Sequence, residues 1–296
     1  MEKPEFVVST EKIYKSFESE IEKLRSVGTL INMEPGLEEI AISAYVKCYD
    51  FMIYICNLDK AENAFFQLPF LRGMCEDLIS VSYLLTLSEN EIKSIVLSKQ
   101  IREFRSSLES QEKFFKKNNP IQPIVPKQVV PDLSKCIEFY KNRGLKITER
   151  YLPSVQKMSK KVGLEDLYNF LYFATSKTVH FDIVTLLSMG WGEMDKEKGT
   201  ISPVFSYQNN YHHYYKFVFF YTSKIFIEQT TKFRSIVDKN GNTISKLESL
   251  IQGYKLIDWP TIITFEQMNL PRPQHSANIL LRAMINIRKE EMLEEE

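Results

Sequence analysis

Two segments of the sequence carry polar side chains that could transfer protons or bind an anion. Arg72 and Glu76 lie four residues apart in an otherwise apolar stretch, so a helix places them on one face. About a hundred residues later, Ser176 and His180 show the same spacing in a second apolar stretch. Arginine holds phosphate groups well, and histidine exchanges protons near neutral pH. We therefore predict a site in which Arg72 holds a phosphate, Glu76 orients Arg72 or His180, and His180 is the general acid or base.

The second segment contains two more polar residues at helical spacing. Asn169 falls within about 40° of Ser176 and His180 around a helix, and Tyr172 precedes Ser176 by four residues. We predict that Asn169, Tyr172 and Ser176 supply hydrogen bonds to a substrate. We call this row of polar residues on the second helix the polar seam. Burying a polar group without a hydrogen-bond partner costs a few kcal/mol, so polar side chains of another helix should face the seam.

The natural partner of this seam is the Arg72–Glu76 pair, and we expect Arg72, Glu76 and His180 to converge in space. The alternative is a structural cluster, in which Arg72 and Glu76 form an internal ion pair while Ser176 and His180 satisfy each other. Exposure separates the two interpretations, because a site needs an opening to solvent and a structural cluster does not.

Both segments are predicted to be helices. The second spans 165–189, is apolar almost all round and ends at Gly190 and Gly192, so we expect it to be central, with Phe173 in the core. The first spans 62–87, where Pro69 predicts either a kink or a fresh start.

Further helices are expected wherever apolar residues recur at helical spacing. These stretches are 10–31, 37–57, 88–117, 132–144, 153–162, 207–237, 243–256 and 276 onward. Ser88 and Glu91 form a capping box at the start of 88–117, and a hairpin across Asn240–Gly241 is a local alternative to a turn. The scarcity of glycine, with ten residues, also favours helices. We predict an all-α protein of eight to ten helices, with strand content near nil.

A segment with four prolines interrupts the helical pattern at 118–131. We predict that it joins two packed helical halves, an N-terminal half at 1–117 and a C-terminal half at 132–296. Because prolines prevent regular structure there, we expect the connection to be exposed and to be cut first by proteases.

Composition limits the classes of function. The chain has 296 residues, 44% of them hydrophobic, and a formal net charge of zero, so no global field attracts nucleic acid or anionic membrane. No apolar run is long enough for a membrane helix, and the N-terminus lacks the apolar core of a signal peptide. Cysteines without CxxC pairing favour buried thiols at Cys48, Cys56, Cys75 and Cys136. We expect a cytoplasmic protein with no membrane contact, no metal and no cofactor.

The segments LPFLRGMCEDL and LYFATSKTVHFD resemble a bacterial all-helical family catalogued as domain of unknown function five-six-seven-seven. Its members pair an Arg-x-x-x-Glu helix with a later Tyr-x-x-x-Ser-x-x-x-His helix. The matching residues here are Arg72, Glu76, Tyr172, Ser176 and His180. The resemblance covers roughly 40–230 and implies a fold and a site more than a reaction.

Apparent relatives of that family include abortive-infection and antiviral-defence proteins, some of them HEPN-type ribonucleases. Those enzymes carry arginine and histidine a few residues apart on one helix, whereas Arg72 and His180 lie on different predicted helices. The resemblance implies a bacterial defence effector, a nuclease acting on RNA or a nucleotide. The alternative is a non-enzymatic binding or scaffold protein whose polar cluster is structural.

Two other stretches bear on partners. The sequence YHHYY at 211–215 predicts a partly exposed aromatic face or an oligomer contact, so a second copy or another protein is an expected partner. Lys160 and Lys161 lie just before the helix at 165–189 and could guide RNA. Because no aromatic residues are interleaved with them, a solvated surface is the simpler interpretation.

Overall fold

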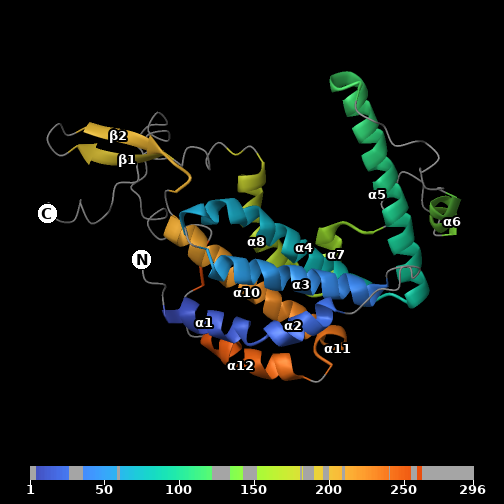
Figure 1. Cartoon of the computed structure of the whole chain (residues 1–296), viewed down its shortest axis with the longest axis horizontal. Coiled ribbons are helices and arrows are strands. Elements are labelled where there is room, and N and C mark those ends of the chain that lie inside the picture. The colour runs from blue at the N-terminus through green and yellow to red at the C-terminus, as the bar shows by residue number, and fades with distance from the viewer. Residues whose placement is uncertain are drawn as a thin grey trace.

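The chain folds mainly into α-helices, as the sequence predicts. The computed structural model describes residues 5–26, 36–58, 61–121, 134–142, 152–180, 182, 190–195, 200–208, 211–239, 241–254 and 259–261. Helices in these ranges hold more than half of the 296 residues, and the strands in them form one small hairpin (Figure 1). The fold class is therefore all-α.

The described elements follow one another along the chain in this order. They are α1 (Glu5–Lys15), α2 (Glu18–Arg25), α3 (Leu37–Cys56), the 3-10 helix η1 (Ala61–Gln67), α4 (Leu68–Leu84), α5 (Glu89–Asn118), α6 (Ser134–Asn142), α7 (Val155–Lys161), α8 (Glu165–Val179), β1 (Gly190–Asp195), β2 (Thr200–Phe205), α10 (Tyr211–Lys232), α11 (Arg234–Val237) and α12 (Asn242–Tyr254).

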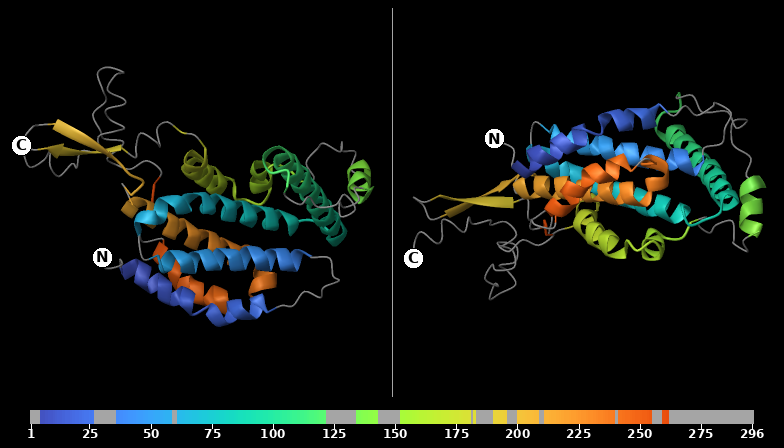
Figure 2. Two further views of the ribbon diagram at one scale, coloured as in Figure 1. Left: turned by 45° about the horizontal axis from the view of Figure 1, so that its top comes forward. Right: turned by 90° about the horizontal axis from the view of Figure 1, so that it is seen from below.

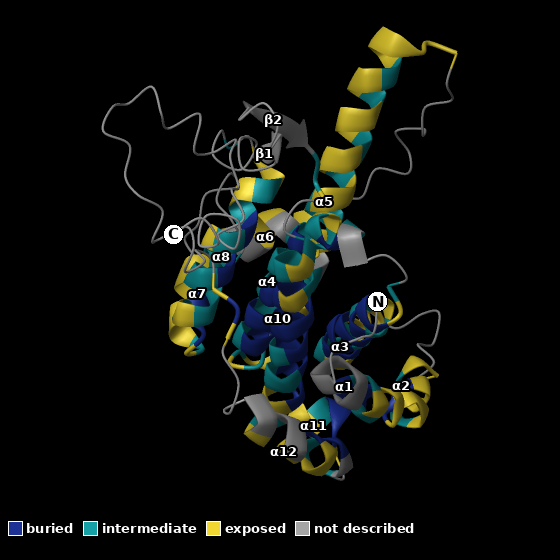
Figure 3. Ribbon diagram, turned by 90° about the vertical axis from the view of Figure 1, so that its left-hand side faces the viewer, coloured by how far each residue is buried: buried dark blue, intermediate teal, exposed yellow. Residues whose placement is uncertain are grey.

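Three helices, α3, α4 and α10, pack against one another at the centre of the molecule (Figures 1 and 2). The middle of α10 is buried on all sides, because every residue from Phe217 to Ser223 is buried (Figure 3). The prediction that the helix at 165–189 is central is therefore wrong. In α8, which packs against α4, the buried residues are Leu171 and Thr175.

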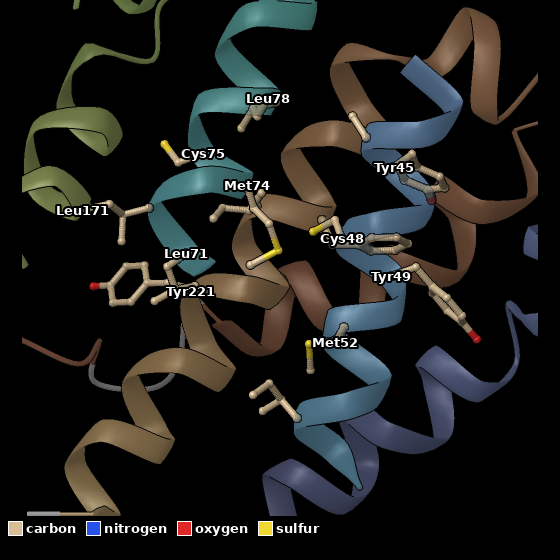
Figure 4. Packing of buried hydrophobic residues seen from close by; sticks show 14 of the residues in the cluster. Tyr45, Cys48, Tyr49, Met52, Leu71, Met74, Cys75, Leu78, Leu171 and Tyr221 are labelled. Atoms are coloured by element: carbon tan, nitrogen blue, oxygen red, sulfur yellow. The ribbon is translucent and has the colours of Figure 1, made fainter. Parts of the chain in front are cut away.

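The core combines aromatic rings with sulfur-containing side chains. The ring of Phe226 in α10 stacks on Tyr45 of α3, with 4.6 Å between ring centres. Figure 4 shows Cys48 and Met52 of α3 directed toward the side of α4 that carries Met74. The thiols of Cys48, Cys56 and Cys75 are buried, as predicted. The side chain of Cys136 lies outside the described residues.

The start of α4 follows one of the two predicted alternatives at Pro69. The chain makes the 3-10 helix η1 and then begins a new α-helix, with Pro69 in its first turn. Proline fits there because the first backbone N–H groups of a helix have no partner within the helix. This fresh start fixes the position of Arg72 in the second turn of α4.

The predicted capping box opens α5. The Ser88 side chain accepts a hydrogen bond from the Glu91 backbone N–H, and the Glu91 carboxylate accepts one from the Ser88 N–H. The first turns of α5 bury Ile92 and Ile95, and the rest of the helix projects away from the bundle (Figures 1 and 2).

The helix at 165–189 is shorter than predicted. α8 ends at Val179, and His180 already has an extended backbone. Hydroxyl groups compete for backbone carbonyls in its last turns, where Thr175 donates to the Leu171 oxygen and Thr178 to the Thr175 oxygen, both at 2.7 Å. β-Branched residues also disfavour helix there.

Gly190 and Gly192 do not end a helix but belong to β1. This strand pairs with β2 in an antiparallel hairpin, in which Gly190 lies opposite Phe205 and Asp195 opposite Thr200. The hairpin is an exception to the expectation of almost no strand. It lies at one end of the molecule, away from the projecting α5 (Figure 1).

Two other boundaries differ from, or refine, the predictions. The expected helix at 10–31 is divided into α1 and α2, because the chain turns at Ser16 and buries Phe17. The turn at 238–241 is present, with Gly241 at a φ of +70°, and it leads into α12 rather than into a hairpin. The buried Asp238 carboxylate accepts hydrogen bonds from the Thr243 and Ile244 N–H groups, both at 2.9 Å.

Helices from both sides of the proline-rich connection share one core, since α10 packs against α3 and α4. The connection from residue 122 onward, the predicted cap and end of the helix at 132–144, and the helix predicted from 276 lie outside the described residues. Within the described ranges, no helix has both the length and the apolar content needed to cross a bilayer.

Candidate functional site

The predicted Arg72–Glu76 pair forms on one face of α4. The Arg72 Nε–H donates a hydrogen bond to the Glu76 Oε1 at 2.8 Å. The side chains remain partly open to solvent, with 27% of Arg72 and 32% of Glu76 exposed. The pair is thus neither sealed in the core nor fully solvated.

Helix α8 brings two tyrosines to this pair. The guanidinium carbon of Arg72 lies 4.8 Å from the ring centre of Tyr172, which places the cation over the ring. The ring of Tyr168 lies 5.7 Å from that of Tyr172 and close enough to feel the charges of Glu76 and Arg72. Helices about a hundred residues apart in the sequence therefore meet at a cationic, anionic and aromatic cluster.

Electrostatics keep this cluster in a defined charge state. The hydrogen bond to Glu76 raises the pKa of Arg72, with further contributions from the charge of Glu76 and from the neighbouring tyrosines. Burial raises the pKa of Tyr168, and the Glu76 carboxylate adds to the effect. At neutral pH the arginine is charged and the Tyr168 hydroxyl keeps its proton.

The ion pair itself contributes little to the stability of α4. Exposed i,i+4 pairs contribute about 0.3–0.5 kcal/mol, and the order with the acidic residue first is the better one. Here Arg72 precedes Glu76, so the order is the less favourable one. The pair does more to fix the guanidinium in place than to hold the helix.

The remaining predicted site residues lie along α8. Asn169 and Ser176 are half-buried, and His180 is exposed at the C-terminal end of the helix. The expectation of a buried polar seam is wrong here, because α8 turns a different face to the core and Phe173 is 61% exposed. The rest of the predicted seam helix, 183–189, lies outside the described residues.

The structure joins Arg72, Glu76 and Tyr172, whereas the contact of His180 with them stays a prediction. Between these described residues, no hydrogen bond or ion pair links the His180 ring to Arg72 or Glu76. The His180 backbone N–H donates a hydrogen bond to the Ser176 oxygen at 2.9 Å. A rise of about 1.5 Å per residue places His180 roughly 12 Å beyond Tyr172 along the helix.

Sequence reasoning missed Tyr168 as a member of the cluster. The signal was present, since Tyr168 precedes Tyr172 by four residues and therefore shares its helical face. Asn169, which we predicted instead, is half-buried, and the contacts recorded around Arg72 and Glu76 do not include it.

The other histidine-containing stretch begins α10. His212 is exposed and stacks on Tyr211 with 3.8 Å between ring centres, while His213 to Tyr215 are half-buried. Among the residues that the structure describes, no three His, Cys, Asp or Glu side chains are grouped so that they could hold a metal ion.

Fold and site together define an all-α protein with a half-exposed cluster of arginine, glutamate and tyrosines between two packed helices. The chain belongs to the family described as "Family of unknown function (DUF5677)", whose model matches residues 38–198. The matched residues include every member of the candidate site, and the family predicted from the sequence is confirmed. No curated protein and no solved structure matches the chain.

Proposed function

We propose that this protein is a cytoplasmic effector of bacterial antiviral defence that cleaves RNA. The observation that carries the proposal is the state of Arg72. Glu76 holds one edge of its guanidinium and Tyr172 one face, yet 27% of the side chain stays exposed. An arginine fixed in this way binds a phosphate with little further loss of side-chain entropy. The nuclease class is proposed because the family that the sequence resembles has apparent relatives among abortive-infection and HEPN-type proteins.

In this proposal the chemistry is a proton transfer next to a held phosphate. The His180 imidazole accepts the proton of a ribose 2′-hydroxyl while the 2′-oxygen bonds to the adjacent phosphorus. The bond from phosphorus to the 5′-oxygen breaks, and that oxygen takes a proton from a water molecule as it leaves. The His180 imidazolium then returns its proton to the hydroxide so formed. The products are a 2′,3′-cyclic phosphate and a 5′-hydroxyl.

Because His180 lies far along α8 from the Tyr172 ring that contacts Arg72, the His180 imidazole and the Arg72 guanidinium act on different phosphates of one RNA chain. Arg72 holds a phosphate upstream or downstream of the one at which His180 acts, because about 12 Å of helix separates Tyr172 from His180. Ser176 lies between them on α8 and supplies a hydrogen bond, as does the Tyr172 hydroxyl. Asn169 keeps its predicted role as a substrate-binding residue.

The test is RNA cleavage by the His180→Ala variant. We expect cleavage to fall at least a hundredfold, with the melting temperature nearly unchanged because His180 is exposed. The matched control is His212→Ala, which removes another exposed histidine and should leave cleavage intact. Equal cleavage by wild-type and His180→Ala protein would contradict the proposed role of His180.

A non-enzymatic binding or scaffold role is the second candidate, and a group of exposed aromatic side chains favours it. Tyr54, Phe66 and Phe70 are each about half exposed. Phe51 stacks on Phe70, and Gln67 donates a hydrogen bond to the Tyr54 hydroxyl, so these side chains form one surface over α3, η1 and α4. Such a surface suits a second copy of the chain or another protein.

Self-association tests this second candidate. If the surface joins two copies, light scattering should give twice the mass of the 34.7 kDa chain, and Phe70→Ser should return it to the monomer. A monomeric wild-type protein would contradict a homodimer at this surface.

A further inference from the structure

One face of α4 continues the Arg72–Glu76 pair toward the C-terminal end of the helix. At about 100° per residue, Arg72, Glu76 and Tyr83 lie within about 40° of one another. The distance from Arg72 to Tyr83 along the helix is about 16 Å, at about 1.5 Å per residue. Ile79 lies on the same face between them and is fully buried, so the parts of this face that are open to solvent are those at Arg72 and at Tyr83.

Two neighbouring helices add side chains to this face of α4. The Nζ of Lys161, at the end of α7, lies 5.0 Å from the ring centre of Tyr83. Helix α8 adds Tyr168 and Tyr172, and both α7 and α8 pack against α4. We call these residues the tyrosine stripe: Arg72, Glu76, Tyr83, Lys161, Tyr168 and Tyr172.

The side chains that make up the tyrosine stripe are all at least partly exposed. Tyr83, Tyr168 and Tyr172 are half-buried, and Lys161 is exposed. Exposed residues mark the surface of α7 beside it (Figure 3). Each tyrosine thus presents part of its surface to solvent while packing fixes the rest of the ring.

Positive charge outweighs negative charge around the tyrosine stripe. The cations of α4 and α7 are Arg72, Lys157, Lys160 and Lys161, and Lys232 joins them where its Nζ donates to the Val162 oxygen at 3.0 Å. The acidic side chains of α4 and of the first turn of α8 are Glu76, Asp77, Glu165 and Asp166, of which Glu76 is paired with Arg72 and Asp77 with Lys47. The surface therefore favours an anionic chain, although the net charge of the protein is zero.

We propose that the tyrosine stripe binds single-stranded RNA and leads it toward His180. Cations that follow a backbone, together with aromatic rings on which bases stack, are the features that bind single strands. Bases stack on the rings of Tyr83 and Tyr168, and phosphates lie against Lys161 and Arg72. A duplex fits less well because its bases already stack inside the helix.

This inference deepens the proposed function by naming the strandedness of the substrate and its path. The lysines of α7 seemed isolated from aromatic residues in the sequence. The fold supplies those residues from other helices, because α4 brings Tyr83 to Lys161. The path from Tyr83 past Arg72 and along α8 to His180 runs over surfaces of packed helices.

Fluorescence anisotropy with a labelled 2′-O-methyl RNA of about ten nucleotides tests the inference without cleavage, since the blocked 2′-oxygen cannot attack. We expect the single strand to bind at least tenfold more tightly than a hairpin of the same composition. Lys161→Ala should weaken binding and reduce the slope of log affinity against log salt by about one. Lys117→Ala, which removes a lysine from the projecting helix α5, is the matched control.

Tyr83→Leu tests stacking while it keeps an apolar side chain of similar reach. We expect about a tenfold loss of affinity with a melting temperature close to that of the parent. Phe114→Leu, at an exposed aromatic residue of the projecting helix α5, should bind as the parent does. Equal binding of single strand and hairpin, or unchanged affinity in both Tyr83→Leu and Lys161→Ala, would overturn the inference.

The two proposals fail separately. Binding at the tyrosine stripe without cleavage of ordinary RNA would leave this inference standing and contradict the nuclease activity. Cleavage that depends on His180 but not on Tyr83 or Lys161 would support the nuclease and overturn the path.

Discussion

At the scale of single residues, burial gives several core groups unusual titration behaviour. Burial raises the pKa of the Cys75 thiol to about 12 and that of the Tyr49 hydroxyl to about 12. A thiol ordinarily titrates near 8.5 and a tyrosine near 10, so the folded state binds these protons more tightly than the unfolded state. These groups stabilise the folded state fully at a pH below the pKa that each has in the unfolded chain. That stabilisation is lost as the pH rises to the higher pKa that each has in the folded protein.

We therefore predict that the free energy of unfolding falls as the pH rises from about 9 toward 12. Urea titrations at pH 8 and pH 11 measure the difference. Cys75→Ala removes one of these groups, so its stability should be lower at pH 8 and should fall less steeply with pH. An unchanged slope in that variant would show that Cys75 does not take part.

The sequence was informative about the cluster where spacing alone decides contact. Arg72 and Glu76 meet because both lie on α4, four residues apart. Tyr172 meets them because α8 packs on α4, as the search for a polar partner suggested. His180 was harder to place, because its position depends on where α8 ends and on which face packs inward. The end of a helix and the face that it buries both depend on tertiary contacts rather than on the periodicity of the sequence.

At the scale of elements, the cap of α5 is a local feature whose effect can be predicted. The Ser88 hydroxyl and the Glu91 carboxylate bind each other's backbone N–H groups, and the turns that follow bury Ile92 and Ile95. We predict that Ser88→Ala lowers the free energy of unfolding by about 1 kcal/mol. Urea denaturation measures it, with Ser110→Ala on the exposed face of α5 as the control. A loss no larger than that of the control would contradict a stabilising cap.

Element boundaries were predictable where a strong local signal exists. Pro69 marked the start of α4, and Ser88 with Glu91 marked the start of α5. The end of α8 was missed because Thr175 and Thr178 carry hydroxyls that bind backbone carbonyls, which apolar periodicity does not register. The hairpin was missed because Gly190 and Gly192 look like a helix end when they are considered without their partner strand.

At the scale of the whole molecule, one core joins the chain on both sides of the proline-rich connection. α10 packs against α3 and α4, and the Tyr45 and Thr230 side chains share a buried hydrogen bond of 2.9 Å. Removing either side would expose the apolar faces of the other. The predicted division at 118–131 therefore separates stretches of sequence whose helices share packing.

We predict that these helices unfold together in one transition. Far-UV circular dichroism follows the helices, and near-UV circular dichroism follows the packed aromatic rings around Phe226. The two signals should give the same urea midpoint. Two separated midpoints would show that the stretches at 1–117 and 132–296 unfold independently.

We propose that Arg72 is held in place in order to bind a phosphate, and the Arg72→Lys variant tests this role. Lysine keeps the charge but loses the planar group that Glu76 and Tyr172 hold. The measurement is the affinity for the 2′-O-methyl single-stranded RNA, taken together with the melting temperature of the same sample. We predict that affinity falls about tenfold or more, while the melting temperature changes by less than about 2 °C because the ion pair contributes little to stability. A large fall in melting temperature with RNA affinity unchanged would show that the cluster is structural and would contradict the claim.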